Sequence, residues 1–163
     1  MKLMKLFVIT ALCVLLLASS GMAQTELPKN IYAGGISYNA SASPQIAGTG
    51  LYARFLADSG TYAFTAVDAL PTTVKPLVVT TQFSAGIAQK ILTIGKVPIY
   101  IPTSAGISYN GTNTGWAWTT GALAVVPVKG NWRVMPNLRM VKSSVSQGSG
   151  YQVIAGFLLG WGE

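Results

Sequence analysis

Apolar and polar side chains alternate through most of residues 30–162, and Gly, Pro, Asn and Ser interrupt the alternation at short intervals. A period of two is typical of β-strands, in which successive side chains point to opposite faces of the sheet. No stretch of this region repeats apolar residues at helical spacing for more than two turns. The pattern predicts an all-β fold with eight strands, at residues 30–40, 46–57, 60–69, 77–93, 97–109, 114–128, 131–145 and 150–162.

Two prolines fall inside the fifth and seventh of these expected strands, at Pro102 and Pro136. Proline lacks the N–H group that a ladder of strand hydrogen bonds requires. We therefore expect a β-bulge at each proline, or strand ends that lie closer to it than the alternation alone indicates.

Few charged residues are available to cover a surface in water, since they make up only 9% of the chain. An average soluble domain has roughly 25%. The polar face of the strands consists mainly of Gly, Ser, Thr, Gln and Asn, which suits the narrow interior of an eight-stranded barrel. The sequence therefore predicts an eight-stranded antiparallel up-and-down transmembrane β-barrel whose apolar face meets lipid. The alternative is a soluble exported barrel that binds an apolar ligand inside, and it requires the opposite arrangement of the two faces.

The first residues have the layout of a secretory signal peptide. Lys2 and Lys5 precede an apolar run at residues 6–18, and an ending rich in small residues follows at 19–23. The apolar run is shorter than the ~20 residues that a membrane-spanning helix needs. We predict a cleaved signal peptide at 1–23, a short lead at 24–29 and the barrel at 30–163.

Aromatic residues gather near the ends of the expected strands. If the chain enters and leaves at the periplasmic rim, the alternation places two groups of them on the apolar face. Such girdles are typical of the two membrane–water interfaces, although strand ends in general also collect aromatic residues. The lower girdle is predicted to contain Tyr32, Phe55, Tyr62, Phe64, Trp132 and Trp161, and the upper girdle Tyr38, Tyr109, Trp116, Trp118 and Tyr151.

The connections between strands favour the same orientation. Short turns are expected at residues 58–60, 95–96 and 129–130, and longer connections at 41–45, 70–76, 110–113 and 146–149. Outer-membrane barrels usually have short periplasmic turns and longer outer loops. The end of the barrel that holds both termini is therefore predicted to be periplasmic.

The polar face also carries basic residues. By alternation we expect a polar cluster in the lumen, and two explanations of it stay open. Its side chains either cross-link and plug the narrow interior, or they line a narrow path that attracts anions, because few acids are available to neutralise them. The predicted members are Arg54, Lys90, Arg133 and Arg139, with Gln82, Asn137 and Tyr52 as polar neighbours.

Several function classes have no support in the sequence. The chain contains no His, which excludes His-dependent hydrolysis and His-ligated metal sites. The four acids, Glu26, Asp58, Asp68 and Glu163, are expected near strand ends or in the tail, so no catalytic carboxylate pair is predicted. The basic residues are scattered singly, unlike the basic face of a nucleic-acid-binding protein. We predict no enzyme activity, no cofactor, no metal and no nucleic-acid partner.

These features together resemble the small bacterial outer-membrane β-barrel proteins of the OmpA/OmpX type, over residues 30–163. The resemblance implies a location in the outer membrane, contact with its lipid, and a structural or surface-interaction role whose external partner is unknown. It also implies recognition by the barrel-assembly machinery, which reads a C-terminal aromatic residue; here Trp161 stands two residues before the end.

One pentapeptide, Gly-Ile-Ser-Tyr-Asn, occurs twice, at residues 35–39 and 106–110. Both copies end an odd-numbered strand, and both are expected to turn Ile and Tyr outward. A duplication of four strands would produce such a repeat, and so would coincidence.

Overall fold

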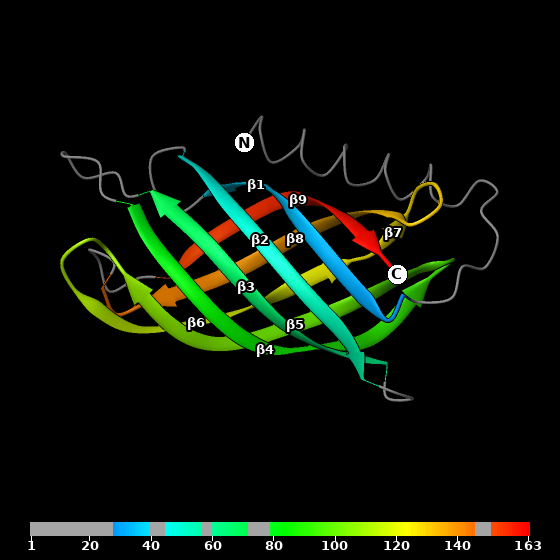
Figure 1. The fold of residues 1–163 in the computed structure, drawn as a ribbon, viewed down its shortest axis with the longest axis horizontal. Coiled ribbons are helices and arrows are strands. Elements are labelled where there is room, and N and C mark those ends of the chain that lie inside the picture. The colour runs from blue at the N-terminus through cyan, green and yellow to red at the C-terminus, as the bar shows by residue number, and fades with distance from the viewer. Residues whose placement is uncertain (1–27, 40–44, 57–59, 72–78, 146–150) are drawn as a thin grey trace.

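The computed structural model describes residues 28–39, 45–56, 60–71, 79–145 and 151–163, which form a closed antiparallel barrel (Figure 1). No helix long and apolar enough to cross a membrane is present in this described part. Its strands are β1 (Asn30–Asn39), β2 (Gln45–Leu56), β3 (Thr61–Pro71), β4 (Val79–Ile94), β5 (Val97–Tyr109), β6 (Thr114–Ala124), β7 (Val126–Pro127), β8 (Trp132–Ser143) and β9 (Gln152–Gly162).

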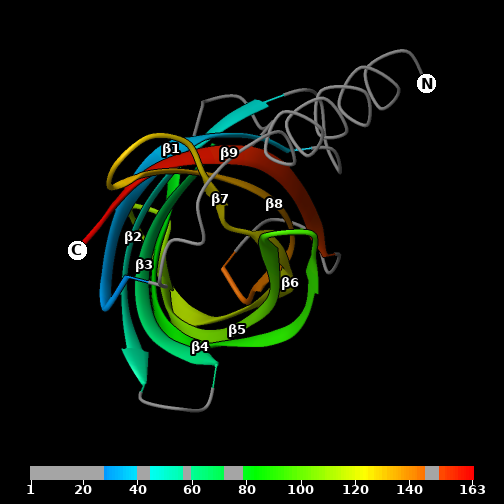
Figure 2. The same ribbon diagram turned by 90° about the vertical axis from the view of Figure 1, so that its right-hand side faces the viewer.

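Successive strands pair with each other from β1 to β6 and from β7 to β9, and two further pairings close the sheet into a ring (Figure 2). β1 pairs with β9, and β6 pairs with β8. The first and last described strands therefore lie side by side, and Asn30 and Glu163 exchange backbone hydrogen bonds of 2.8 and 3.0 Å. We call the end of the barrel with these two residues the terminal end and the other the far end. The predicted fold class is confirmed.

The sixth predicted strand, residues 114–128, is interrupted at Val125, so that β6 and β7 occupy one position in the barrel. In the register of β6, β7 and β8, Ala124 would pair with Pro136, which has no N–H to donate. On the other side of this strand position, the Val125 N–H still donates to the carbonyl of Pro98 on β5, at 3.1 Å. Pro136 thus lies opposite a strand break, where the sequence predicted a bulge or a strand end.

Pro102 stays inside β5, opposite Ala88 of β4. On its other side the pairing with β6 passes from Tyr100 to Thr103 and leaves out Ile101 and Pro102. The ladder is therefore interrupted on one side only. The single register shift between β4 and β5 lies at Ile91, so the bulge expected at Pro102 is absent.

Neighbouring strands approach each other closely at several glycines that lie at inward-facing positions. A Cβ atom at Gly106 would lie 2.6 Å from the Cα of Ser84 on β4 and against the Phe83 carbonyl, and one at Gly35 would lie 2.8 Å from the Cα of Leu158 on β9. These two glycines open the two copies of the repeated pentapeptide. The absence of a side chain there allows the sheet to coil tightly enough to close.

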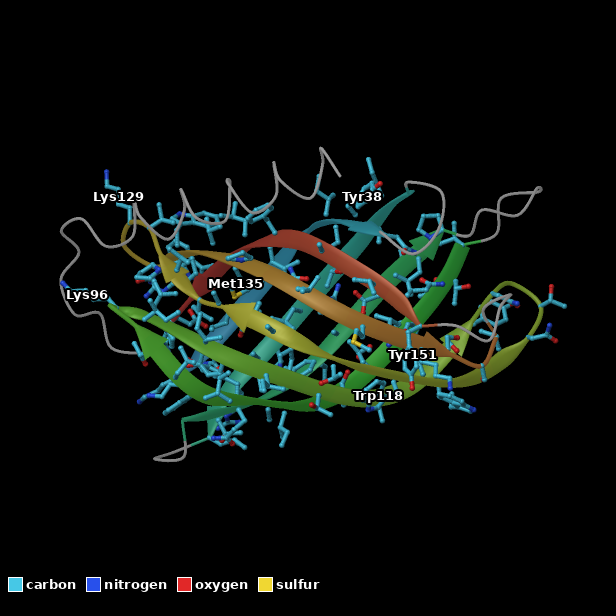
Figure 3. All side chains as sticks on the ribbon, turned by 180° about the vertical axis from the view of Figure 1, so that it is seen from behind. Tyr38, Lys96, Trp118, Lys129, Met135 and Tyr151 are labelled. Carbon is cyan, nitrogen blue, oxygen red and sulfur yellow. The ribbon has the colours of Figure 1, made fainter. Side chains whose placement is uncertain are left out.

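Two tight turns lie at the terminal end, where the sequence predicted them. Gly95 and Gly130 have φ angles of 60° and 56°, a conformation that glycine adopts without strain. Lys96 and Lys129 stand beside them, at the same end of the barrel in Figure 3. The connections expected at residues 41–45, 70–76 and 146–149 lie wholly or mostly outside the described residues, and so does the predicted signal peptide at 1–23.

Replacing Gly106 by Ala is expected to lower the free energy of unfolding by about 1–3 kcal/mol, because its Cβ meets backbone atoms that cannot move aside cheaply. Gly50→Ala is the matched control, since a Cβ there meets nothing within 4 Å. Urea unfolding in detergent micelles, followed by tryptophan fluorescence, measures both. Equal midpoints for the two variants would contradict this explanation of closure.

Candidate functional site

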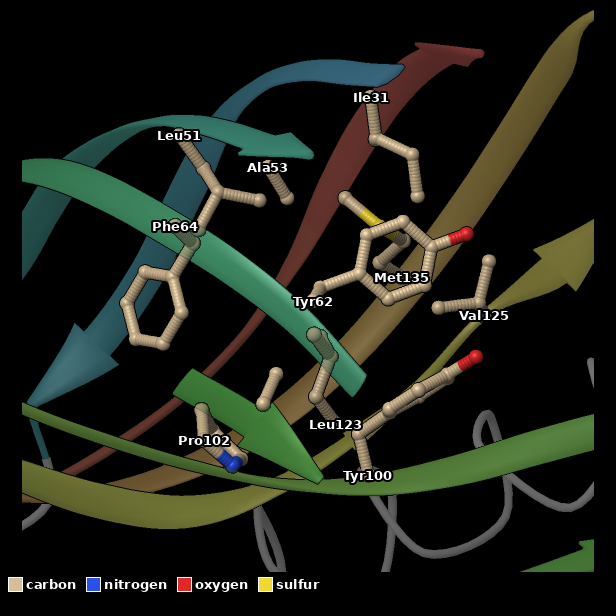
Figure 4. A pocket seen from close by; sticks show the side chains of 11 residues that line it. Ile31, Leu51, Ala53, Tyr62, Phe64, Tyr100, Pro102, Leu123, Val125 and Met135 are labelled. Atoms are coloured by element: carbon tan, nitrogen blue, oxygen red, sulfur yellow. The ribbon is translucent and has the colours of Figure 1, made fainter. Parts of the chain in front are cut away.

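The half of the barrel interior nearer the terminal end is apolar (Figure 4). Rings and aliphatic side chains meet there from all sides of the barrel, and the cavity between them measures only about 30 Å³. Tyr62 and Tyr100 contact edge to face, with ring centroids 5.6 Å apart. The buried members of this apolar cluster are Ile31, Ala53, Tyr62, Phe64, Ala66, Ala88, Tyr100, Leu123, Val125, Met135 and Leu158.

Polar groups cover the apolar cluster at the terminal end. The Tyr62 hydroxyl donates a hydrogen bond of 2.8 Å to the carbonyl of Pro28, which is buried. Arg133, only 5% exposed, donates from Nη1 to the carbonyls of Gly130 (2.7 Å) and Trp132 (2.9 Å). The Arg133 cation is thus held by backbone oxygens at the rim.

A buried ion pair lies above the apolar cluster, toward the far end. Arg139 of β8 crosses the interior to Asp68 of β3, and the closest N–O distance is 3.0 Å. The exposed fraction is 7% for Arg139 and 1% for Asp68. Thr49 on β2 joins the pair, because its hydroxyl donates to Asp68 Oδ1 at 2.6 Å and accepts from Arg139 Nη2 at 2.7 Å. Asn137 Oδ1 accepts from Arg139 Nε at 3.2 Å.

The remaining polar interior lies around and above this pair. Gln82 Nε2 of β4 donates to Thr119 of β6 at 2.9 Å on the inner side of β5, and the Ser143 hydroxyl donates to Ser108 at 2.7 Å nearer the far end. A second small cavity of about 20 Å³ is bounded by Ser104, Thr119 and Arg139, among other residues. Side chains from several strands thus contact one another at each of the interior levels described above.

Three residues predicted for the lumen lie elsewhere. Tyr52 and Arg54 are exposed on the outer face of β2, because the inward side chains of this strand are Ala47, Thr49 and Ala53. Lys90 is exposed at the terminal end, one residue beyond the last β3–β4 pair. Arg133, Arg139, Gln82 and Asn137 are buried in the interior, where the alternation placed them.

Three aromatic residues predicted for the lower girdle point into the barrel. Tyr62 and Phe64 are 3% and 8% exposed, and Phe55 packs against the apolar cluster with its ring 5.0 Å from Tyr62. Eight strands enclose a space that side chains must fill, and these rings fill its apolar half. The expectation of a polar interior throughout is therefore wrong for the half nearer the terminal end.

The other predicted girdle residues, with Tyr52, lie on the outer face. Tyr52, Tyr32, Trp161 and Trp132 follow one another in register across β2, β1, β9 and β8. Their rings pack in two pairs, Tyr32 with Tyr52 at 5.1 Å and Trp132 with Trp161 at 5.3 Å. We call these four residues the aromatic row.

Toward the far end, Trp118 contacts Tyr151 edge to face at 6.2 Å (Figure 3). The ammonium of Lys142 lies 5.1 Å from the centre of the Tyr151 ring and 5.8 Å from that of Trp116. Tyr38 and Tyr109 lie on the same outer face near the ends of β1 and β5.

The lumen carboxylate Asp68 was missed by sequence reasoning, which placed it near a strand end. A signal for it existed in the sequence. Asp68 alternates in phase with Tyr62 and Phe64, and an acid in the middle of a strand cannot face lipid without great cost. The charge of Asp68 therefore indicates which face of β3 is inside.

No group of three or more His, Cys, Asp or Glu side chains that could hold a metal ion occurs within the described ranges. The polar contacts described above consist of one ion pair and hydrogen bonds.

No protein-family profile matches the chain, and no curated protein sequence matches it. Solved structures of similar fold do exist. Neisserial surface protein A superposes with a TM-score of 0.61 at 10% identity, over 82% of this chain and 96% of that one. The Yersinia pestis outer membrane protein Ail gives 0.52 at 10% identity, over 82% and 99%. A designed transmembrane β-barrel gives 0.51 at 12% identity, over 85% and 98%. The chain has the fold of small transmembrane barrels.

Breaking the buried ion pair is expected to destabilise the barrel. Asp68→Leu and Arg139→Met each leave one buried charge without its partner, which costs about 3–5 kcal/mol of unfolding free energy. The double variant removes both charges and is expected to recover at least half of the larger single loss. Urea unfolding in phospholipid vesicles measures all three. A double variant that loses the sum of the two single effects would show that the charges act independently.

Proposed function

We propose that the chain is a non-enzymatic outer-membrane β-barrel protein with a structural or surface-interaction role and an interior that does not conduct ions. The proposal depends above all on the inverted distribution of side chains. Ile46, Ile36 and Ile107 are 68%, 67% and 58% exposed on the outside, whereas Asp68 and Arg139 are buried inside. In water an apolar surface of this kind is unfavourable, and in lipid it is the expected exterior.

The same distribution argues against a soluble barrel that carries an apolar ligand. Such a protein exposes polar residues and keeps an apolar cavity for its cargo. Here the apolar part of the interior is already filled by its own side chains around about 30 Å³ of space, which is far below the roughly 300–1,000 Å³ of ordinary ligand pockets.

The contacts of the interior favour a plug over an anion-attracting path. Arg139 is neutralised by Asp68, and Arg133 donates to backbone carbonyls. Arg54 and Lys90 lie outside the lumen. Of the four cations that suggested an anion path, Arg133 and Arg139 therefore have partners within the barrel, and Arg54 and Lys90 do not line the lumen.

The location follows from the likeness in fold to outer-membrane proteins together with the predicted signal peptide at residues 1–23. Lipid is then the partner of the apolar exterior. The barrel-assembly machinery is a further proposed partner during insertion, and β9 with Trp161 is the segment it would read. An external partner would be met at the far end, which we assign to the outside of the cell.

Membrane fractionation tests the location. The full chain is expected in the outer-membrane fraction, and its gel mobility should shift on boiling, as folded barrels do. Recovery in the soluble periplasmic fraction, with no shift, would refute the proposal.

Planar bilayers test the closed interior. The parent protein is expected to give no steady conductance, because side chains from β1 to β6, β8 and β9 meet in the apolar cluster. Anion-selective conductance that reverses in Arg139→Glu would favour the pore instead.

A charge introduced on the outer face tests whether this face meets lipid. Ile87 is 51% exposed in the middle part of β4, and Ile87→Arg is expected to cost about 2–4 kcal/mol in a bilayer. Tyr109→Arg is the control at the end of β5, where the cost falls to about 0–1 kcal/mol. Vesicle unfolding titrations measure both, and two equal small effects would indicate that this face meets water.

A further inference from the structure

Exposed cations surround the terminal end of the barrel. They come from separate segments: the start of β1, the end of β2, the β4–β5 hairpin and the β7–β8 turn. Within the described ranges, the acidic side chain at this end is Glu163, while Glu26 and Asp58 lie outside them. The exposed cations are Lys29, Arg54, Lys90, Lys96 and Lys129.

Two of these cations, Arg54 and Lys129, lie next to the aromatic row. Arg54 follows Tyr52 by two residues on the same outer face of β2, one step closer to the rim. Lys129 lies in the turn that leads into β8, whose first residue is Trp132. On this side of the barrel the aromatic rings are therefore bordered by positive charge toward the terminal end, and Lys90 and Lys96 add positive charge on the β4–β5 side.

Carboxylates of the described chain leave three of these cations unneutralised. The ion pair that the described residues form is the internal one between Arg139 and Asp68, and it involves none of Arg54, Lys90 and Lys129. Long basic side chains beside a membrane extend toward the headgroup phosphates. Rings such as those of the aromatic row are stable at the same depth.

We propose that the terminal end binds the headgroups of anionic phospholipids in the adjoining leaflet. The proposal rests on the proposed function, since it requires the barrel to span a bilayer. Guanidinium and ammonium groups match lipid phosphates in charge and hydrogen bonding, and their distribution over several strands matches a layer of many small headgroups better than one compact ligand.

The far end provides the contrast. Its described outer-face cation, Lys142, already lies over the rings of Trp116 and Tyr151. Lys142→Gln is therefore a charge-matched control for any single substitution at the terminal end, and it changes the net charge by the same amount as Arg54→Gln.

Quenching of tryptophan fluorescence by brominated lipids measures whether the terminal end prefers anionic phospholipid to zwitterionic phospholipid. The chain has four tryptophans, and Trp116→Phe with Trp118→Phe leaves only Trp132 and Trp161 of the aromatic row. The protein is folded into phosphatidylcholine vesicles that contain an equal, small fraction of either brominated phosphatidylglycerol or brominated phosphatidylcholine. The ratio of the two quenching efficiencies reports the lipid preference around the terminal end.

We expect the phosphatidylglycerol preference to be about fivefold or more, the factor that one basic residue near an anionic surface supplies. It should fall toward one in the triple variant Arg54→Gln/Lys90→Gln/Lys129→Gln, fall partly in Arg54→Gln and remain in Lys142→Gln. High salt should weaken it.

Equal quenching by the two lipids in the parent would overturn the lipid proposal while leaving the membrane barrel intact. A preference that survives in the triple variant, or that disappears equally in Lys142→Gln, would overturn the assignment to the terminal end. If neither lipid quenches the tryptophans, the chain is not in the bilayer and the proposed function fails as well.

Discussion

Closure of the sheet is the constraint on which the rest of the structure depends. A strand in hydrocarbon cannot leave its N–H and C=O groups unpaired, so the pairings of β1 with β9 and of β6 with β8 are required for a barrel that spans a membrane. A ring of so few strands must coil tightly. Inward glycines such as Gly35 and Gly106 allow neighbouring strands to approach where a Cβ would collide with backbone. The small circumference in turn leaves an interior of side-chain width.

The interior meets this limit in two different ways. Near the terminal end, aromatic and aliphatic side chains fill the space, and Tyr62 satisfies its hydroxyl on the Pro28 carbonyl. Farther along, an uncompensated charge would be costly. There Arg139 pairs with Asp68 and donates to Thr49 and Asn137, and Thr49 in turn donates to Asp68. A buried pair of this kind is weak evidence for added stability. Its partners on β2, β3 and β8 do, however, tie opposite walls of the barrel together.

Much of the fold was accessible from the sequence, because alternation and turn residues are local signals. Strand number, antiparallel order and the inward faces of β4, β5, β8 and β9 follow from them. The break at Val125 was not accessible, since it depends on Pro136 being its neighbour across the β6–β8 register. The partner of Arg139 was equally hidden, because Asp68 lies 71 residues away in the chain and reaches it only across the closed barrel.

The two faces assigned wrongly belong to neighbouring strands, β2 and β3, and the errors have one origin. Aromatic residues were assigned to lipid, although Tyr62 and Phe64 are needed to fill the interior. Reversing the parity of a strand exchanges all of its side chains between the two faces. In β3 the reversal brings Asp68 to Arg139, and in β2 it takes Arg54 out to the rim. The interior then holds two of the four predicted cations, Arg133 on backbone carbonyls and Arg139 on Asp68, and a positive charge appears beside the aromatic row. The charge balance of the interior thus depends on the parity of these two strands, and Asp68 is the acid that this parity brings to Arg139.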